Sequence, residues 1–396
     1  MGVIAGSVGF GNINVDTRPK AWMGLAWESD SHQMPLAVLT SLMPTEVVID
    51  PEYNWFEQDV ELFEILSDGA ATASITTLTF KDSSGGGVNN NLRNGSQLKN
   101  DRTTEIVLVT ADPSANTGAV TVTRAFMDKT VADASVVDGD RWTILGFIDE
   151  DNKASPRAIS TEASKKTNYI QLMRESIDVG IMMSQADMRT GPEYAKRRRI
   201  AYNAFLRRWD RTWVHSEPKS SGGSTADVIR NATGGLMHPI SSNTKDFNGT
   251  VSESSFDKVL GKLGRYGSRR KMGLCGVDSI SVVNTIAKFS GGTIYMEPEA
   301  ETYGLMINTY RHALLHLQML YVPALGTSTN YSGTMIVVDT AQLSRLIYKN
   351  LDFKLRKGVE EKGVLGIKDE YLMASGLKLV LERHHGLLTE MTSWVP

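Results

Sequence analysis

The sequence predicts an α+β protein, and three observations support this fold class. Runs of alternating Thr, Val and Ile fill much of the stretch between residues 68 and 148, a pattern typical of antiparallel strands. A stretch from 191 to 215 repeats apolar residues every four positions, which is the spacing of one helix face. Shorter helix and strand patterns follow it. With 41% hydrophobic and 22% charged residues among 396, the chain has enough apolar residues for a sizeable core.

Residues 1–45 are predicted to form an extended N-terminal arm. Gly, Asn, Pro and Ser recur throughout it, and Trp22 and Trp27 are scattered without a helical or strand period. Because such an arm has aromatic residues of the buried type but no core of its own, we expect it to lie on another surface.

The segment that follows the arm is acidic, since no Lys or Arg occurs between Lys20 and Lys81. Within it, WFEQDVELFEIL (55–66) is predicted to be a short amphipathic segment. The apolar residues that share one face are Phe56, Val60, Phe63 and Ile65 or Leu66. The acidic residues selected as candidates for contact with another part of the chain or another copy are Glu52, Glu57, Asp59, Glu61 and Glu64.

Residues 68–148 are predicted to form a series of antiparallel strands. Clusters of Asp, Gly, Asn and Pro separate the alternating runs and supply turn signals. The runs are ITTLTF (75–80), TEIVLVT (104–110), AVTVTRAF (119–126) and RWTILGFI (141–148). GGGVNNN (85–91) lies between them, and we expect a flexible loop tip at Gly85, Gly86 and Gly87.

The longest predicted helix spans 191–215 and follows a strand pattern that begins at Asn168. Pro192 suits the first turn of a helix. The apolar stripe consists of Ala201, Phe205, Trp209 and Trp213. The basic residues on the remaining faces are Lys196, Arg197, Arg198, Arg199, Arg207, Arg208 and Arg211. At about 1.5 Å per residue this helix is ~35 Å long, so we expect it to serve as a structural support.

The rest of the chain is predicted to be mixed. A Ser/Gly linker at 219–225 leads to a Gly-Gly-Leu turn at 234–236. Ser252 or Ser254 is expected to cap a helix that runs to Gly264. The further predicted elements are a strand at 272–277, a helix at 279–288, strands at 314–323 and 333–339, and a closing apolar segment at 370–388.

The separation of acidic and basic residues has two interpretations. Complementary charges indicate that the two parts meet, within one chain or between copies. Alternatively, each part is an ordinary solvated face. The net charge of -3 provides no global field that would recruit nucleic acid or anionic membrane. Nonspecific contact of the basic helix with phosphates is a weaker alternative, because its aromatic stripe favours burial over base stacking.

The sequence contains none of the common catalytic or metal-binding motifs. It lacks a GxGxxG after a strand, a GxxxxGK[ST] loop, a CxxC pair and a GxSxG elbow. Cys275 is the single cysteine, so an intrachain disulfide is impossible. His312 and His316 have i,i+4 spacing, but no Glu follows His312. His384 and His385 would point to opposite sides of a strand. We therefore expect no enzyme activity, no metal and no cofactor.

Neither a membrane span nor a signal peptide is evident. No run approaches the roughly 20 apolar residues of a membrane helix, and the first ten residues lack a basic region followed by a long apolar run. We expect a soluble protein that is made in a cytoplasm.

The order of these segments resembles the major capsid proteins of tailed bacteriophages, whose fold is shared with encapsulins and the herpesvirus capsid floor. TEVVIDPEYNWFEQDVE (45–61) is similar to the acidic, aromatic entry to the extended loop of that family. AVTVTRAF together with VDGDRWTILGFIDED resembles its β-rich insertion. The other matches are NYIQLMRESIDVGIMMSQADMRTG (168–191) with the return strand, GPEYAKRRRIAYNAFLRRWDRTWVHS (191–216) with the spine helix, and TGGLMHPI (233–240) with the turn into the axial domain.

The resemblance implies a division of the chain into five parts. These are an N-terminal arm (1–45), an extended β-hairpin loop bearing a small β-rich insertion (46–150), a peripheral domain with the spine helix 191–215 (151–233), an axial domain (234–330) and returning strands of the peripheral domain (331–396). The resemblance also implies a coat protein that self-assembles into pentamers and hexamers of an icosahedral shell around double-stranded DNA. The acidic and basic residues would then be partners between neighbouring copies.

The implied location is the virion capsid, with assembly in the host cytoplasm. The implied partners are other copies of the chain, a portal and a separate scaffolding protein, since no scaffold-like domain precedes Thr45. A decoration protein and nonspecific contact with packaged DNA are further partners of this kind, and no membrane is expected.

Three other functions remain as alternatives. The first is an encapsulin-like compartment shell, against which the long β-rich insertion favours the phage branch. The second is an unrecognised hydrolase, which would need a pocket with a convergent nucleophile and base. The third is a nucleic-acid-binding protein, which would show strongly salt-dependent affinity.

Overall fold

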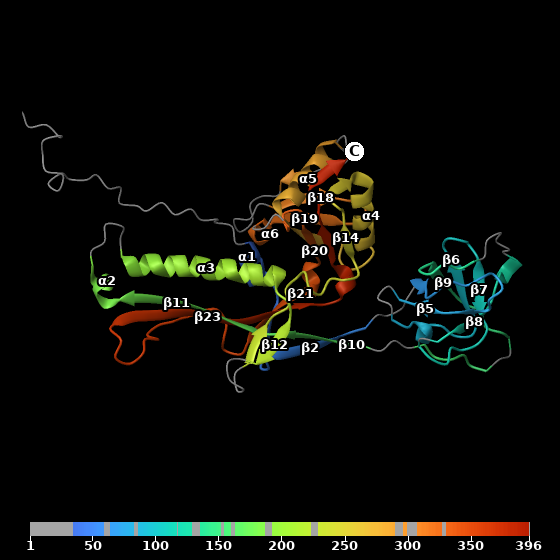
Figure 1. Ribbon diagram of the computed structural model, residues 1–396, viewed down its shortest axis with the longest axis horizontal. Helices are drawn as coiled ribbons and strands as arrows, with labels where there is room; N and C mark the ends of the chain where they lie inside the picture. Colours follow the sequence, from blue (N-terminus) through green and yellow to red (C-terminus); the bar gives the residue numbers. More distant parts are fainter. Residues whose placement is uncertain are drawn as a thin grey trace, which may run out of the picture.

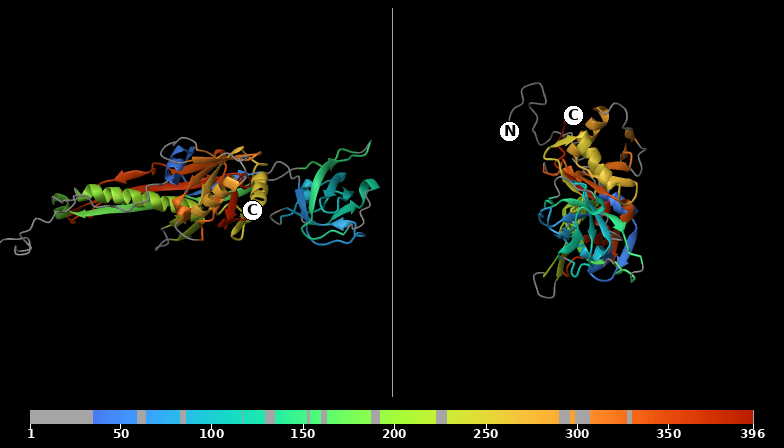
Figure 2. Two further views of the ribbon diagram at one scale, coloured as in Figure 1. Left: turned by 90° about the horizontal axis from the view of Figure 1, so that it is seen from above. Right: turned by 90° about the vertical axis from the view of Figure 1, so that its right-hand side faces the viewer.

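The computed structural model describes residues 35–58, 64–82, 86–116, 118–128, 135–151, 154–159, 163–186, 192–222, 229–289, 296–298, 307–326 and 330–395. The described part is elongated, with a small β-rich domain at one end and a long helix beside two long strands towards the other (Figure 1). The same extended outline appears from above (Figure 2). Residues 1–34 of the predicted N-terminal arm lie outside the described residues, so that prediction is not tested there. The end of the predicted arm is not extended, because residues 35–42 form a helix and Leu36 and Met43 pack in the main core.

A five-stranded sheet and a long helix form the central body. The strand order is β1-β21-β23-β11, and β22 also pairs with β23. The strands are β1 (Thr45–Val48), β11 (Gln171–Gly180), β21 (Leu343–Tyr348), β22 (Lys354–Arg356) and β23 (Gly366–Leu379). The helices of this part are α1 (Pro35–Leu42), α2 (Ile181–Gln185), α3 (Glu193–His215) and α6 (Pro323–Gly326).

The apolar stripe predicted for the long helix is confirmed by its packing. Phe205, Trp209 and Trp213 are each no more than 3% exposed, and they share a core with Ile177 and Val179 of β11. The rings of Trp209 and Trp213 stack with their centroids 5.3 Å apart. Because three large aromatic side chains are withdrawn from water on one face, α3 is fixed along the sheet rather than projecting from it.

A seven-stranded sheet forms a second layer with its own core. Its order is β14-β24-β20-β16-β19-β18-β17. The strands are β14 (Thr244–Asp246), β16 (Arg270–Cys275), β17 (Met296–Pro298), β18 (Ile307–Arg311), β19 (His316–Tyr321), β20 (Met335–Val338) and β24 (Gly386–Thr389). Helices α4 (Glu253–Leu263) and α5 (Val277–Phe289) belong to this part. Of the two predicted caps for α4, Ser252 is the one used, in a reciprocal capping box with Ser255.

The segment 331–396 divides between the two sheets, which differs from the expectation that all of it returns to one domain. β21, β22 and β23 join β11, whereas β20 and β24 pair with each other, and β20 also pairs with β16 in the seven-stranded sheet. The adjacent histidines lie between these sheets rather than in a strand, since Glu382–His384 forms a short 3-10 turn. His385 is completely buried and His384 is not.

The β-rich stretch forms a separate domain, here called the insertion domain (64–148). Its seven-stranded sheet has the order β4-β8-β7-β6-β9-β3-β5. The strands are β3 (Glu64–Ser67), β4 (Thr77–Leu78), β5 (Phe80–Lys81), β6 (Ser96–Asn100), β7 (Ile106–Val109), β8 (Val120–Thr123) and β9 (Arg141–Phe147). Its core contains Trp142 at 0% exposure and no residue of the other cores. The four predicted strand runs are therefore found, and β3 and β6 are additional strands.

Three two-stranded pairs complete the fold. They are β2 (Glu52–Glu57) with β10 (Ser164–Tyr169), β12 (Lys219–Gly222) with β13 (Ile229–Ala232), and β15 (Thr250–Ser252) with β25 (Ser393–Val395). The β2–β10 pair, here called the ribbon, leads from the central body towards the insertion domain (Figure 1). The amphipathic segment predicted at 55–66 is wrong for 55–57, which lie in β2, because Tyr53 and Trp55 alternate with outward-facing neighbours at the period of a strand. It is also wrong for 64–66, which lie in β3, and residues 59–63 lie outside the described residues.

Candidate intersubunit surfaces

The ribbon is anchored to the central body by buried polar contacts at its base. Tyr53 Oη donates a 2.6 Å hydrogen bond to the carbonyl oxygen of Leu377, and Asn168 Nδ2 donates to the same oxygen at 2.8 Å. Asn168 Oδ1 accepts from the amide of Gly234 at 2.7 Å. Burial raises the pKa of Tyr53 above its ordinary value, so the phenol stays a neutral donor. These bonds fix the direction in which the ribbon leaves the body.

The predicted acidic residues do not form one surface. Glu57 is used inside the chain, where its carboxylate accepts from Trp55 Nε1 at 2.8 Å and from the amide of Leu381 at 2.9 Å. Glu64 lies 3.4 Å from Arg141 and 3.3 Å from Arg265. Glu52 is exposed and has no cationic partner among the described residues. The predicted positions Asp59 and Glu61 lie outside the described residues.

Most of the predicted basic residues on α3 have partners within the chain. Arg197 Nε lies 2.8 Å from Glu193, one helical turn away, and Arg208 forms an ion pair with Glu175 of β11. The remaining contacts are Arg198 Nε to Tyr371 Oη at 3.3 Å and Arg207 Nε to the carbonyl of Asn203 at 3.3 Å. Arg199 is exposed and is also engaged in an interaction.

Lys196 and Arg211 differ from the other predicted basic residues. Neither has an ion-pair partner within the part of the chain that the structure describes, and Arg211 is exposed. No ion pair joins the acidic candidates to the basic candidates among the described residues either. The charge segregation is therefore not explained by contact between these residues within one copy, and contact between copies stays a prediction.

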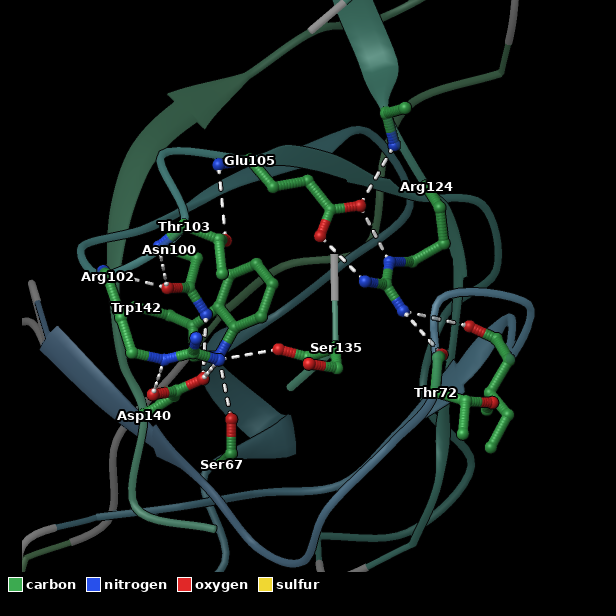
Figure 3. A network of polar contacts seen from close by, with 12 residues as sticks. Ser67, Thr72, Asn100, Arg102, Thr103, Glu105, Arg124, Ser135, Asp140 and Trp142 are labelled. Atoms are coloured by element: carbon green, nitrogen blue, oxygen red, sulfur yellow. Dashed lines mark hydrogen bonds and ion pairs between the residues drawn. The ribbon is translucent and has the colours of Figure 1, made fainter. Parts of the chain in front are cut away.

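The insertion domain is held together by two arginine–carboxylate pairs (Figure 3). Arg124 binds the buried carboxylate of Glu105 with two 2.7 Å hydrogen bonds. Arg102 binds Asp140 in the same bidentate way, at 2.8 and 2.7 Å. Trp142 Nε1 donates to Ser67 Oγ at 2.7 Å. Bidentate pairs of this kind fix geometry as well as charge, so they give the domain a defined shape.

Asp140 is ionised across the whole neutral and mildly acidic range. The hydrogen bond from Arg102 lowers the pKa of Asp140 to about 2 despite partial burial, and the amide of Val137 contributes in the same direction. These two charge pairs were missed by sequence analysis because an isolated Arg or Glu in a strand pattern gives no signal of its partner.

The predicted glycine tip is described only in part. Gly85 lies outside the described residues. The amide of Gly86 donates to Asp82 Oδ1 at 2.6 Å, and Gly87 forms a β-bridge with Lys81. These contacts place Gly86 and Gly87 beside Asp82 and Lys81, and the flexibility of this tip stays a prediction.

Helix α2 and the start of β23 lie at the end of the sheet farthest from the insertion domain (Figure 1). Several apolar side chains of this region are exposed. We call this group the apolar tip. The apolar tip consists of residues in α2 and near the start of β23, which lie side by side because Gly180 pairs with Gly366. Met182 is 86% exposed and Leu365 is 78% exposed. Its members are Ile181, Met182, Met183, Val364, Leu365 and Ile367. Neighbouring exposed apolar residues of this number mark an interaction site more often than a free surface.

The candidates for chemistry are not brought together. Among the described residues, no group of three metal-ligating side chains is present. His312 Nε2 lies 2.8 Å from Asp257, while His316 is exposed at the start of β19. Cys275 is buried, and burial raises the pKa of its thiol to about 12, so it is not a thiolate nucleophile.

A shallow cavity of about 270 Å³ lies beneath the ribbon. Trp55, Lys166 and His238 line it, and Glu382 closes one side. Glu382 accepts hydrogen bonds from the amides of Ser241 and Ser242, so its carboxylate serves to hold the 241–242 turn.

None of the described helices is both long and apolar enough to cross a membrane.

Comparison with known proteins identifies one family over most of the chain. The family model described as SU10 major capsid protein matches residues 38–392. No curated protein sequence matches the chain.

Several solved structures resemble the chain. The capsid of cyanophage P-SCSP1u has 8% identity and a TM-score of 0.44, covering 94% of this chain and 93% of that chain. A structure of Gordonia phage Cozz has 10% identity and a TM-score of 0.45, covering 96% and 92%. The holo-SrpI encapsulin complex from Synechococcus elongatus has 11% identity and a TM-score of 0.45, covering 60% and 80%.

Proposed function

Because this chain belongs to the SU10 major capsid protein family and is a structural shell protein of a phage capsid rather than an enzyme, we propose that it assembles as pentamers and hexamers of an icosahedral shell around double-stranded DNA. The family match over residues 38–392 is the observation that carries this proposal. Electron microscopy of the expressed, purified protein tests it. Closed particles or free capsomers are expected, whereas monomers alone at every concentration and with scaffolding protein added would contradict it.

The insertion domain and the ribbon would form the main contact between neighbouring copies. A two-stranded ribbon is marginal in water unless something covers it, and Phe56 on its outer face is 70% exposed. The insertion domain has its own core and lies apart from the body (Figure 1). These features support a rigid domain on a ribbon that lies over the neighbouring copy and buries Phe56 there.

A charge contact between copies would use the candidate residues that have no ion-pair partner among the described residues of one copy. Lys196 and Arg211 on α3 are the available cations, and Glu52 at the start of β2 is the available carboxylate. The other predicted members that the structure describes are engaged within the chain, so we assign them a supporting role, and Asp59 and Glu61 stay candidates. Oppositely charged surfaces chiefly guide correct encounter and register, so this contact would set assembly rate and accuracy.

A double charge reversal tests this contact. Lys196→Glu with Arg211→Glu should slow assembly and make it less dependent on salt, and adding Glu52→Lys should restore the rate in part. Lys258→Glu, on the exposed face of α4, is the matched control and should assemble normally. Light scattering during assembly at two salt concentrations gives the rates. Equal rates for the wild type and the double variant would exclude the contact.

The apolar tip would be buried against a second copy. Its exposed residues are too numerous for a free surface, and a shell brings copies together at several places on each subunit. Met182→Ser with Leu365→Ser should therefore reduce particle yield while leaving the fold intact, as judged by circular dichroism. Ile229→Ser, at another site with 66% exposure, is the control. Unchanged particle yield would contradict this assignment.

Further partners follow from the same function. A portal, a separate scaffolding protein and a decoration protein are proposed as partners, together with nonspecific contact between the shell interior and packaged DNA. Assembly is proposed to occur in the host cytoplasm, and the finished location is the virion capsid. Co-expression with candidate scaffolding and portal proteins from the same genome, followed by purification of particles, tests these partners.

A further inference from the structure

Helix α1 is the first described element of the chain, and it depends on α3 for its stability. It contains eight residues, which is too short for an isolated helix to persist in water. Leu36 is 1% exposed and packs in the same core as Phe205 and Trp209 of α3, together with Met43 just beyond the helix. Docking on α3 therefore holds this part of the chain in place.

The first turn of α1 is capped by a side chain from α3. The helix begins at Pro35, so Leu36 and Ala37 carry its first free amides. Met34, which precedes it in the sequence, has no side-chain oxygen that can cap a helix. The carboxyl group of Asp210 lies against the amides of Leu36 and Ala37 instead, and both amides lower its pKa.

Asp210 is unusual because half of its carboxyl group has no partner. The residue is 4% exposed, and its Oδ1 makes no hydrogen bond. A buried ionised carboxylate normally needs a cation or donors for both oxygens. A neutral carboxyl group costs much less to bury than a carboxylate, even with one oxygen unpartnered.

Among the residues that the structure describes, no neighbouring charge compensates for an ionised Asp210. Helix α1 has the sequence PLAVLTSL and carries no titratable side chain, and none occurs in α6. The charged groups of the other packed elements have contacts elsewhere or face solvent. They are Arg207 at the Asn203 carbonyl, Arg208 with Glu175, Arg211 in solvent, His215 at the Ala324 carbonyl, and Arg345 with Asp352.

We propose that Asp210 is a protonation switch that controls the docking of α1 on α3. In its neutral form the carboxyl group caps α1 and holds it against the helix. In its ionised form the same group places an uncompensated charge in the core, and α1 loosens. The switch sets how firmly the beginning of the described chain is attached to the body, which goes beyond the proposed shell function.

The pH range of the switch follows from the burial of the group. Burial raises the pKa of Asp210 to about 7, while the amides of Ala37 and Leu36 oppose the rise. When α1 is undocked and Asp210 is solvated, the pKa returns to about 3.9. The docked state therefore binds the proton more tightly. Docking is strongest below pH ~4, weakens by up to about tenfold per pH unit towards pH 7, and is constant above it.

Hydrogen exchange of the full-length chain tests the switch, with all variants in one assembly state. The readout is the protection of peptides covering 35–43, corrected for intrinsic rates, between pH 5 and 8. Asp210→Asn keeps an acceptor oxygen but cannot ionise. In the wild type, protection should fall by tenfold or more between pH 5 and 7. In Asp210→Asn it should not change with pH, and it should exceed the wild-type value at pH 7.5.

Two further variants complete the test. Asp210→Ala removes the acceptor and should lower protection at pH 5 about tenfold, while Glu217→Gln, an exposed acid just after α3, should match the wild type. A flat wild-type profile, or the same slope in Asp210→Asn, would overturn the proposal. Protection of Asp210→Ala equal to that of Asp210→Asn would overturn the capping role. If Asp210→Ala fails to fold, the pH profiles of the wild type and Asp210→Asn still decide whether Asp210 controls the docking of α1.

Discussion

His385 shows how one buried side chain makes the stability of the body depend on pH. Its Nδ1 accepts from the amide of Asp339 at 3.2 Å, and its Nε2 donates to the carbonyl of Val380 at 3.1 Å. The bond at Nδ1 requires the neutral ring, whereas Nε2 can donate in either protonation state. Burial lowers the pKa of His385 to about 4, and the nearby ammonium of Lys271 acts in the same direction. The ring therefore stays neutral where an exposed histidine is charged.

The sign of the resulting pH dependence is fixed by this lowered pKa. Between pH 6.5 and 4 the unfolded chain binds a proton that the folded chain does not, so the free energy of unfolding falls on acidification, by about 3 kcal/mol in total. Denaturant unfolding at several pH values measures it. His385→Gln should lack this part of the slope, and His316→Gln, which alters an exposed ring, should retain it. Parallel slopes for wild type and His385→Gln would contradict the assignment.

At the scale of single elements, α4 allows a sharp test of its cap. Ser252 Oγ accepts from the amide of Ser255 at 3.3 Å, and Ser255 Oγ contacts the amide of Ser252 at 3.2 Å. Ser252→Ala should lower the free energy of unfolding by about 1 kcal/mol. Ser254→Ala, the neighbouring exposed serine, should change it by less than about 0.5 kcal/mol. Chemical denaturation of both variants measures the difference, and equal effects would exclude the capping box.

Elements with a strong period could be predicted from the sequence, and α3 is the clearest example. Three of the four apolar residues of its stripe are deeply buried, and the fourth, Ala201, is partly buried against the same core. The spacing of the apolar residues alone was sufficient to predict the buried face of α3, because that face packs on a single sheet. The α+β class and the family likewise followed from the order of such elements.

Strand β6 shows why other elements could not be predicted. Its sequence is SQLKN, and only Leu98 is apolar. Ser96 and Asn100 are nevertheless fully buried, because Ser96 Oγ donates to the carbonyl of Arg93 and Asn100 contacts Asp140. Their burial depends on partners from elsewhere in the domain. The same holds for Asp210, whose partners in α1 lie far away in the sequence.

At the scale of the whole molecule, the separate cores predict separate unfolding. Trp142 is fully buried in the insertion domain and meets Phe80 edge to face at 5.8 Å. Trp142→Ala should destabilise this domain by about 3–5 kcal/mol without affecting the central body. Hydrogen exchange should show lost protection at 96–109 and unchanged protection at 171–180, in β11 of the central body. Equal loss in both segments would mean that the two parts unfold as one cooperative unit.

Only the three-dimensional structure shows which of the charged candidate residues are already engaged inside the chain. The sequence distinguished acidic from basic segments, but it did not indicate which charges have partners inside the chain. Glu57 and Arg208 are engaged within one copy, whereas Lys196 and Glu52 remain available. That distinction depends on three-dimensional neighbours, so composition cannot supply it.

The ribbon has a consequence for how this chain can be altered. Ser164 pairs directly with Glu57, so the chain leaves and re-enters the body at neighbouring points. The entropy of closing a loop grows only slowly with its length, so a short turn or a foreign domain could replace residues 58–163 with little effect on the folding of the body. Such an exchange would convert the insertion domain into a replaceable module, and the position into a natural site for displaying other folded domains on a shell.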